Sequence, residues 1–193
     1  GPESFTPDSN FLLGETEEIK NFYVCCGFNS IGIGSSGGAG KVVAEWMIKG
    51  HTDQDLFSLD VKRFEKFNSS LKFIKERTTE TLGNLFKMHW PYKQLDTSRN
   101  VKLLPYHNYL KKLGACFGQM AGYERPMWFS NKQKPKYKYS FDYQNWYQSA
   151  KRECLNTRNN LGFFDLTPFV KFDFYGRHAH SQLQYLCAND IKN

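Results

Sequence analysis

The residues best suited to chemistry are concentrated in one glycine-rich stretch, residues 27–40. Six of these fourteen residues are glycine, so the backbone can adopt positive φ and approach a ligand closely. An apolar run at 21–26 precedes the stretch and an amphipathic run at 41–49 follows it, which predicts a strand, a glycine turn and a helix. The first amides of a helix have no partner within it, and the helix dipole makes that end electropositive. We therefore expect the turn to face an anion or an electron-rich ligand.

Three kinds of ligand use such a turn. Gly32, Gly34 and Gly37 match the dinucleotide pattern G-x-G-x-x-G, but a polar loop follows the helix where that fold needs a second strand. A phosphate-binding P-loop fails, because Ser35 stands at its first glycine and Val42 at its Ser/Thr position. A flavin ring is favoured, since its reduced form carries negative charge that a helix N-terminus would stabilise. A tight corner without a ligand stays open as the alternative.

Other polar motifs give weaker indications, and none identifies a catalytic residue. His178 and His180 form an H-x-H pair without a nearby carboxylate or cysteine, which favours a surface turn over a metal site. The five cysteines lack C-x-x-C spacing, so we expect free, mostly buried thiols and no metal. The stretch 123–126 (Tyr-Glu-Arg-Pro) favours a buried ion pair at a domain junction over an active-site wall.

Composition predicts a packed protein. Hydrophobic residues make up 40% of the chain and aromatic residues 17%, which is ample material for a core. No stretch approaches the roughly eighteen apolar residues that span a bilayer. The net charge of +7 suits a nucleic-acid partner, but the basic residues are dispersed except at 132–139, where lysines and tyrosines alternate. We interpret that cluster as a solvated linker, and we expect no nucleic-acid partner.

The elements that position the turn follow from hydrophobic periodicity. Residues 1–21 are expected to form a loop, and residues 21–26 a strand buried on both faces of a sheet. Ser69 or Ser70 is expected to cap a helix that runs to about residue 86. Its apolar stripe would comprise Leu71, Ile74, Leu82, Leu85 and Phe86. Further helices are expected at 106–113, 142–158 and 181–188, and a strand within 162–175.

Several separate motifs, in the same order, resemble the sarcosine and dimethylglycine dehydrogenase family. They are GPESFTPD at 1–8, GFNSIG at 27–32, GGAG at 37–40, DVKRF at 60–64 and YERPMWF at 123–129. The resemblance extends over nearly the whole chain. Residues 40–50 and 60–64 resemble most closely one family member, the regulatory subunit of pyruvate dehydrogenase phosphatase. One departure is Gly-Arg-His-Ala at 176–179, where the family often has Gly-x-Asp-Ala.

The resemblance implies a mixed fold, α/β followed by α+β. Residues 1–60 would be the C-terminal end of an FAD-dependent oxidoreductase domain of the amine-oxidoreductase type, with its strand, glycine turn and helix. Residues 61–120 would be the short, helical central linker domain of the family. Residues 121–193 would start a folate-binding, aminomethyltransferase-like domain that resembles the T-protein. The ADP-binding motif would then lie upstream, and most folate-pocket residues downstream.

The resemblance also implies a function. The parent protein would oxidise a small amine of the N-methylglycine type by hydride transfer to FAD, with one-carbon transfer to tetrahydrofolate, and this chain alone would be inactive. The alternative is a regulatory subunit that binds the phosphatase catalytic subunit. The resemblance places either protein in the mitochondrial matrix. It assigns flavin contact to Gly27, Phe28, Asn29, Ser30, Ile31, Gly32 and Ile33.

Overall fold

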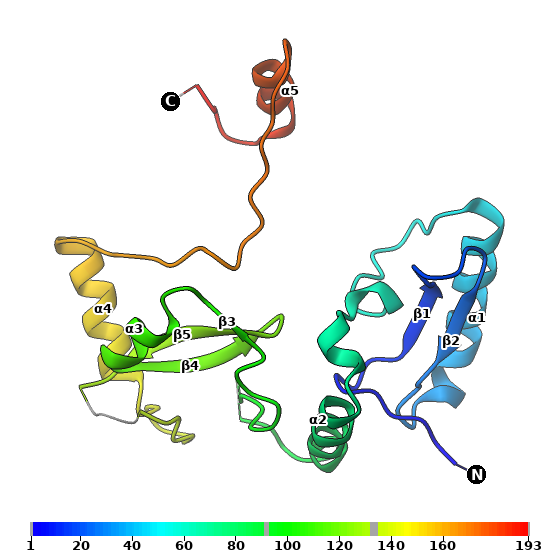
Figure 1. Cartoon of the computed structure of the whole chain (residues 1–193), viewed down its shortest axis with the longest axis horizontal. Coiled ribbons are helices and arrows are strands. Elements are labelled where there is room, and N and C mark those ends of the chain that lie inside the picture. The colour runs from blue at the N-terminus through cyan, green and yellow to red at the C-terminus, as the bar shows by residue number, and fades with distance from the viewer. Residues whose placement is uncertain (1, 91–92, 132–134, 193) are drawn as a thin grey trace.

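The computed structural model describes residues 2–90, 93–131 and 135–192. The described chain builds two small sheets, each flanked by helices, and then an extended arm that ends in a short helix (Figure 1). The first sheet belongs to the N-terminal part and the second to residues 102–129. Helix α2 (Leu71–Asn84) lies in the stretch of chain that connects them.

The N-terminal part is an antiparallel hairpin covered by one long helix. Strand β1 (Leu12–Glu15) pairs with β2 (Tyr23–Cys26), and α1 (Gly32–Lys49) packs on the hairpin. Their shared core contains Leu13, Ala39 and Val43. A Cβ atom at Gly14 would lie 2.7 Å from the Trp46 ring, so glycine is what lets the helix approach the strand this closely.

The strand predicted at 21–26 is confirmed as β2, but two expectations around it are wrong. Residues 1–21 include β1, a short strand that the glycine and proline punctuation of this region concealed. Cys25 and Cys26 are exposed, so β2 is not buried on both faces. The reason is that the sheet has two strands and α1 covers one face of it, whereas burial on both faces needs layers on each side.

The helix after the turn begins nine residues before the predicted start at 41. Five glycines therefore lie in α1, at 32, 34, 37, 38 and 40, although a glycine in a helix interior costs about 1 kcal/mol relative to alanine. Packing of Val43 and Trp46 against the hairpin supplies the stability that the helix propensity of this segment lacks. The end is as predicted, because Gly50 adopts φ +76° and donates its N–H to the carbonyl of Trp46. The turn itself is confined to residues 27–31.

The connecting region contains two 3-10 turns, η1 (Val61–Arg63) and η2 (Lys66–Ser69), followed by α2. Ser70 caps α2 as predicted, and its hydroxyl accepts a hydrogen bond from the Phe73 amide. The predicted apolar stripe is wrong. The buried residues of α2 are Phe73, Arg77, Thr81 and Asn84, whereas Leu71, Ile74, Leu82 and Phe86 are exposed. Hydrogen bonds from Arg77 to the loop at 97–98 and to Gln119 turn this polar face inward.

The second sheet was not predicted. Its strand order is β3 (Lys102–Leu103), β5 (Tyr123–Phe129), β4 (Ala115–Met120), with β3 parallel and β4 antiparallel to β5. Ala121 and Gly122 join β4 to β5, and both have positive φ, which is the backbone of a tight hairpin. The predicted helix at 106–113 is confirmed as α3 (His107–Lys112).

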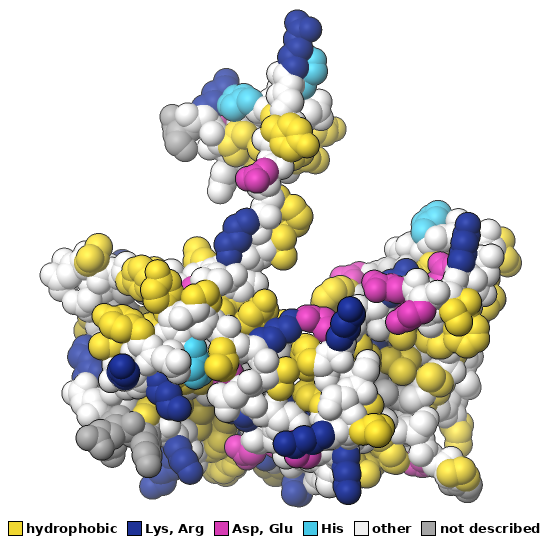
Figure 2. Space-filling model, viewed as in Figure 1, with side chains coloured by type: hydrophobic (Ala, Val, Ile, Leu, Met, Phe, Trp, Pro, Cys, Tyr) yellow, Lys and Arg dark blue, Asp and Glu magenta, His cyan; other side chains and the backbone are white. Residues whose placement is uncertain are grey.

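The C-terminal helices are confirmed with shifted bounds, as α4 (Tyr147–Asn159) and α5 (Ala179–Leu186). The strand expected within 162–175 is wrong, because this segment is an extended arm without strand pairing in the structure. Its alternating apolar residues fit a strand, but a strand also needs an adjacent edge for hydrogen bonds. Figure 2 shows apolar side chains along the arm. Phe163, Phe172 and Tyr175, which belong to this segment of the chain, are exposed.

All five cysteines are free, as predicted, but they are not mostly buried. Cys116 alone is buried, and burial raises the pKa of its thiol to about 11. Within the described ranges, no helix has the length and apolar character needed to cross a membrane.

Candidate functional site

The turn between β2 and α1 has an unusual backbone. Gly27, Asn29 and Ser30 have φ values of +70°, +50° and +68°, in the left-handed region that glycine and asparagine tolerate best. A Cβ atom at Gly27 would lie 2.8 Å from Cγ2 of Thr6. The chain therefore turns tightly against the segment at 3–6.

Asn29 holds this turn in place. Its side chain is 3% exposed, its Oδ1 accepts a hydrogen bond from the Thr6 amide at 2.9 Å, and its Nδ2 donates to the Gly27 carbonyl at 2.6 Å. Its own amide donates to the Ser4 carbonyl at 3.1 Å. Next to it, the Ser30 hydroxyl donates to the carboxylate of Glu3. The polar atoms of the Asn29 side chain are thus committed to the protein.

Helix α1 begins without a side-chain cap. Ile31 is its N-cap residue, and the first turn carries no acidic residue. The first intrahelical hydrogen bond runs from the Ser35 amide to the Ile31 carbonyl. The amides of Gly32, Ile33 and Gly34 precede it, so they are donors without an intrahelical acceptor at the electropositive end of the helix.

The first turns of α1 are open to approach. Ile33 is fully exposed and Ile31 is 50% exposed. A Cβ atom at Gly34, Gly37 or Gly38 would meet no described atom within 4 Å. Backbone donors, a helix dipole and an uncrowded glycine face fit an electron-rich, planar group such as a flavin ring.

Of the seven residues of the predicted flavin contact, the structure places those at 27–31 in the turn and Gly32 and Ile33 in the first turn of α1. They differ in the direction that they face. Phe28 stacks on Phe11, with ring centroids 4.9 Å apart, and so belongs to the hydrophobic core. Gly27 and Asn29 are buried, whereas Ser30, Ile31 and Ile33 are exposed.

Sequence reasoning missed Arg63, the arginine that holds the N-terminal segment next to this turn. Arg63 of η1 is paired with Asp8, with distances of 2.7 Å from Nε to Oδ2 and 3.0 Å from Nη2 to Oδ1. The two residues are 55 positions apart, so no periodicity could connect them. The available signal was that each lies in a motif of the family resemblance, at 1–8 and at 60–64.

A second arginine–carboxylate pair joins Arg99 to Glu124 of β5. Glu124 is 1% exposed, and its Oε1 accepts hydrogen bonds from Arg99 Nε and from the Asn100 amide, each at 2.8 Å. Burial opposes ionisation of Glu124, but these hydrogen bonds hold its pKa below the ordinary value. The buried ion pair predicted at 123–126 is confirmed in part, because Glu124 belongs to such a pair but its partner is Arg99, outside this stretch.

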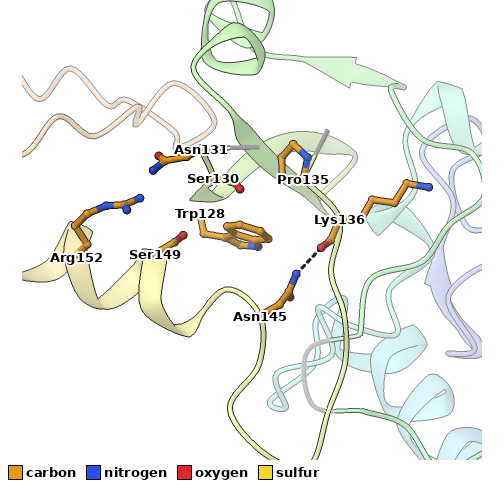
Figure 3. A pocket seen from close by; sticks show the side chains of 8 residues that line it. All are labelled: Trp128, Ser130, Asn131, Pro135, Lys136, Asn145, Ser149 and Arg152. Carbon is orange, nitrogen blue, oxygen red and sulfur yellow. Dashed lines mark hydrogen bonds between the residues drawn. The ribbon is translucent and has the colours of Figure 1, made fainter. Parts of the chain in front are cut away.

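One cleft of about 360 Å³ lies between the end of β5 and α4. Figure 3 shows its lining, in which the Asn145 side chain donates to the Lys136 carbonyl at 2.8 Å. The residues that line it are Trp128, Ser130, Asn131, Pro135, Lys136, Asn145, Ser149 and Arg152. Six of these eight residues have polar side chains, two of them basic, and we assign the cleft no ligand.

The lysine–tyrosine cluster predicted at 132–139 borders this cleft, and its residues 132–134 lie outside the described residues. Tyr137 and Tyr139 stack on each other with ring centroids 5.7 Å apart. Tyr137 also contacts Trp128, and Tyr139 contacts Trp90. The tyrosine rings are therefore engaged in an aromatic cluster. In the part of the chain that the structure describes, no group of three or more potential metal ligands occurs, at His178 and His180 or elsewhere.

Two family models match the chain in succession. The FAD dependent oxidoreductase central domain matches residues 49–103, and the GCVT N-terminal domain matches residues 106–193. Arg63, Arg77 and Arg99 thus lie in the first match, and Glu124 lies in the second.

The chain is similar to several curated proteins along almost its whole length. It is 44% identical over 191 residues to 4-methylaminobutanoate oxidase (formaldehyde-forming) of Paenarthrobacter nicotinovorans, covering 98% of this chain and 23% of the relative. For mitochondrial sarcosine dehydrogenase of Mus musculus, identity is 30% over 217 residues, covering 99% and 24%. For the mitochondrial pyruvate dehydrogenase phosphatase regulatory subunit of Mus musculus, identity is 31% over 196 residues, covering 98% and 22%. The chain thus spans about a quarter of the length of these relatives. It belongs to the sarcosine and dimethylglycine dehydrogenase family of FAD-dependent oxidoreductases.

Proposed function

We propose that the protein takes part in the oxidation of an N-methylated amino acid, with FAD as the hydride acceptor. The observation that carries the proposal is the uncapped start of α1, where three amides lack intrahelical acceptors beside exposed Ile31 and Ile33. The relatives support the substrate class, because 4-methylaminobutanoate and sarcosine, which their names contain, are both N-methylated amino acids.

In this proposal residues 27–33 form the wall that faces the flavin. The amides of Gly32, Ile33 and Gly34 stabilise negative charge on the ring. Ile31 and Ile33 keep water from it, and Asn29 fixes the turn from behind. FAD supplies the redox chemistry when it is bound.

The second half of the proposal concerns the one-carbon unit. The GCVT N-terminal domain at 106–193 supports tetrahydrofolate as its acceptor. We propose domains at 1–60, 61–120 and 121–193 for the flavin domain, the central linker and the start of the folate-binding domain. Limited proteolysis of the full-length protein, with the cleaved bonds identified by mass spectrometry, tests these bounds.

Ile33 offers a direct test of the flavin contact. In the full-length protein, Ile33→Glu places a carboxylate in the first turn of α1, which stabilises the helix itself but repels a negatively charged reduced flavin. We expect a more negative midpoint potential of the bound flavin than in the neutral control Ile33→Gln. Equal potentials in both variants would contradict the contact.

A second candidate function is regulatory, and the 31% identity to the phosphatase regulatory subunit favours it. Its partner would be the phosphatase catalytic subunit. Anaerobic mixing with sarcosine, dimethylglycine or 4-methylaminobutanoate distinguishes the two, because bleaching of the flavin absorbance supports the oxidoreductase. Bound flavin that none of them reduces supports the regulatory role. We propose the mitochondrial matrix as the location, as the names of the two mouse relatives suggest, and cell fractionation tests it.

A further inference from the structure

We propose that Arg63 is a positioning residue that sets where the start of α1 stands relative to the flavin. This inference rests on the proposed flavin contact at 27–33. Arg63 itself lies in the stretch matched by the central domain, outside the turn, and it acts on the turn through the N-terminal segment.

Arg63 joins two backbone segments, the loop at 8–10 and residues 59–60. Its side chain is 8% exposed. Besides its two bonds to the Asp8 carboxylate, Nη1 donates to the carbonyls of Leu59 and Asp60 at 2.9 and 3.1 Å. Nη2 also donates to the Asn10 carbonyl at 2.8 Å. A planar guanidinium can make this set of contacts at once, whereas the single ammonium group of lysine cannot.

The next step passes through Thr6. The Asn10 carbonyl, which accepts from Arg63, also accepts from the Thr6 hydroxyl at 2.8 Å. Thr6 is 4% exposed, and its amide donates to Asn29 Oδ1 at 2.9 Å. A continuous series of hydrogen bonds thus runs from Arg63 through Asn10 and Thr6 to Asn29.

The anchor of this series does not depend on the turn. Leu13 of β1 donates its amide to the Leu59 carbonyl at 2.9 Å and forms a parallel bridge with Asp60. The chain just before Arg63 is therefore fixed to the hairpin. From this fixed point, Arg63 holds the loop at 8–10, and that loop holds the turn. Loosening Arg63 moves the turn without removing any amide of α1.

Such a movement changes the reduction potential of the flavin, because the electrostatic effect of a helix terminus falls off within its first turn. Displacements of about 1 Å are large in catalytic terms. The expected consequence is a weaker preference for the reduced flavin. A general loss of stability would instead lower the fraction of protein that carries FAD and leave the potential of the bound flavin unchanged.

The test uses the full-length FAD-loaded protein and the variant Arg63→Lys, which retains the charge. We expect the equilibrium between reduced and oxidised flavin to shift about tenfold toward the oxidised form, which is about 30 mV for a two-electron couple. Lys62→Ala is the matched control, because Lys62 is exposed in the same 3-10 turn, and it should leave the potential unchanged. If Arg63→Lys does not retain FAD, Thr6→Val breaks the series at its next member, and Thr6→Ser restores the hydroxyl.

The Ile33→Glu variant separates the failure of this inference from the failure of the proposed contact. If Ile33→Glu shifts the potential and Arg63→Lys and Thr6→Val do not, the positioning role is wrong and the flavin contact stands. If none of the three shifts it, the contact itself is wrong. Reduced FAD occupancy with an unchanged potential would also overturn the positioning role.

Discussion

The two arginine–carboxylate pairs, Arg63–Asp8 and Arg99–Glu124, have similar geometry and different surroundings. Each arginine offers Nε and Nη2 to both oxygens of one carboxylate. The Asp8 side chain is 34% exposed, however, whereas that of Glu124 is 2% exposed. Water can replace a lost partner at Asp8 but not at Glu124. The first pair is therefore suited to holding a loop in place, and the second to determining whether the junction folds.

The two arginines, which both lie in the stretch matched by the central domain, also bind carboxylates on opposite sides of it along the sequence. Arg63 reaches back to the N-terminal segment that pins the glycine turn. Arg99 reaches forward to β5, in the stretch matched by the GCVT N-terminal domain. The central segment thus fixes both neighbours with the same chemistry, and burial makes the difference between them.

The largest effect is expected at the buried pair. Glu124→Gln leaves Arg99 without its counter-ion, which costs about 3–5 kcal/mol of unfolding free energy. Denaturant titration of the full-length protein measures this cost. Glu17→Gln is the control, because Glu17 is exposed, and it should change stability by less than about 0.5 kcal/mol. Similar losses in both variants would show that burial does not distinguish the carboxylates.

An effect of comparable size is expected at Asn29, where the series from Arg63 ends. Asn29→Ala leaves the Thr6 amide and the Gly27 carbonyl without their bonds, at about 1–3 kcal/mol for each buried group. Asn29→Gly removes the same side-chain amide group, but glycine tolerates the φ of +50° at this position. This variant should therefore be about 1 kcal/mol more stable than Asn29→Ala. Thermal unfolding of the two variants gives the difference. Equal stability would mean that the left-handed backbone carries no strain.

The sequence predicts the local parts of this structure and misses those that depend on distant partners. Gly50, Ser70 and the strand at 23–26 follow from propensity and capping. The start of α1 does not, because tertiary packing of Val43 and Trp46 outweighs five helical glycines. The inward face of α2 is also missed, since Arg77 is buried by its bonds to Gln119, which is 42 residues away.

The candidate site shows the same division. The glycine turn could be located from the residues between 21 and 49 alone, but the start of its helix at Gly32 could not. Neither Asp8–Arg63 nor Arg99–Glu124 could be paired, because a carboxylate does not reveal which arginine it meets across 55 or 25 residues. The second sheet was missed for a related reason. Pro126 and Gly118 lower the strand propensity of β5 and β4, and the pairing of these strands becomes visible only in the fold.

Acid should remove the stability that the ionised carboxylates of Glu124 and Glu80 contribute. Burial raises the pKa values of Glu124 and Glu80, but hydrogen bonds outweigh it and hold both below the ordinary 4.5. A lowered folded-state pKa means stability that is complete above the unfolded value and is lost as pH falls through the folded one. We expect the share of the unfolding free energy that these two carboxylates supply to be complete down to about pH 5.5 and to be lost as pH falls below about 4.5. In Glu124→Gln this decrease should be smaller, and an unchanged slope would exclude Glu124 as its source.

The smallest effect is expected at Asp8, and it completes the comparison. Asp8→Asn keeps an oxygen for Arg63 but removes the charge of a partly exposed pair, which costs about 1 kcal/mol or less. Because salt screens accessible charges, the difference from wild type should shrink further in about 1 M sodium chloride, where the Debye length is about 3 Å. The cost of Glu124→Gln should be nearly independent of salt, since water and ions do not reach that carboxylate. Denaturant titrations at low and high salt measure both. A loss of unfolding free energy in Asp8→Asn that does not depend on salt would mean that the charge of Asp8 contributes nothing. Arg63 would then hold the loop through hydrogen bonds to neutral acceptors, mainly the carbonyls of Asn10, Leu59 and Asp60.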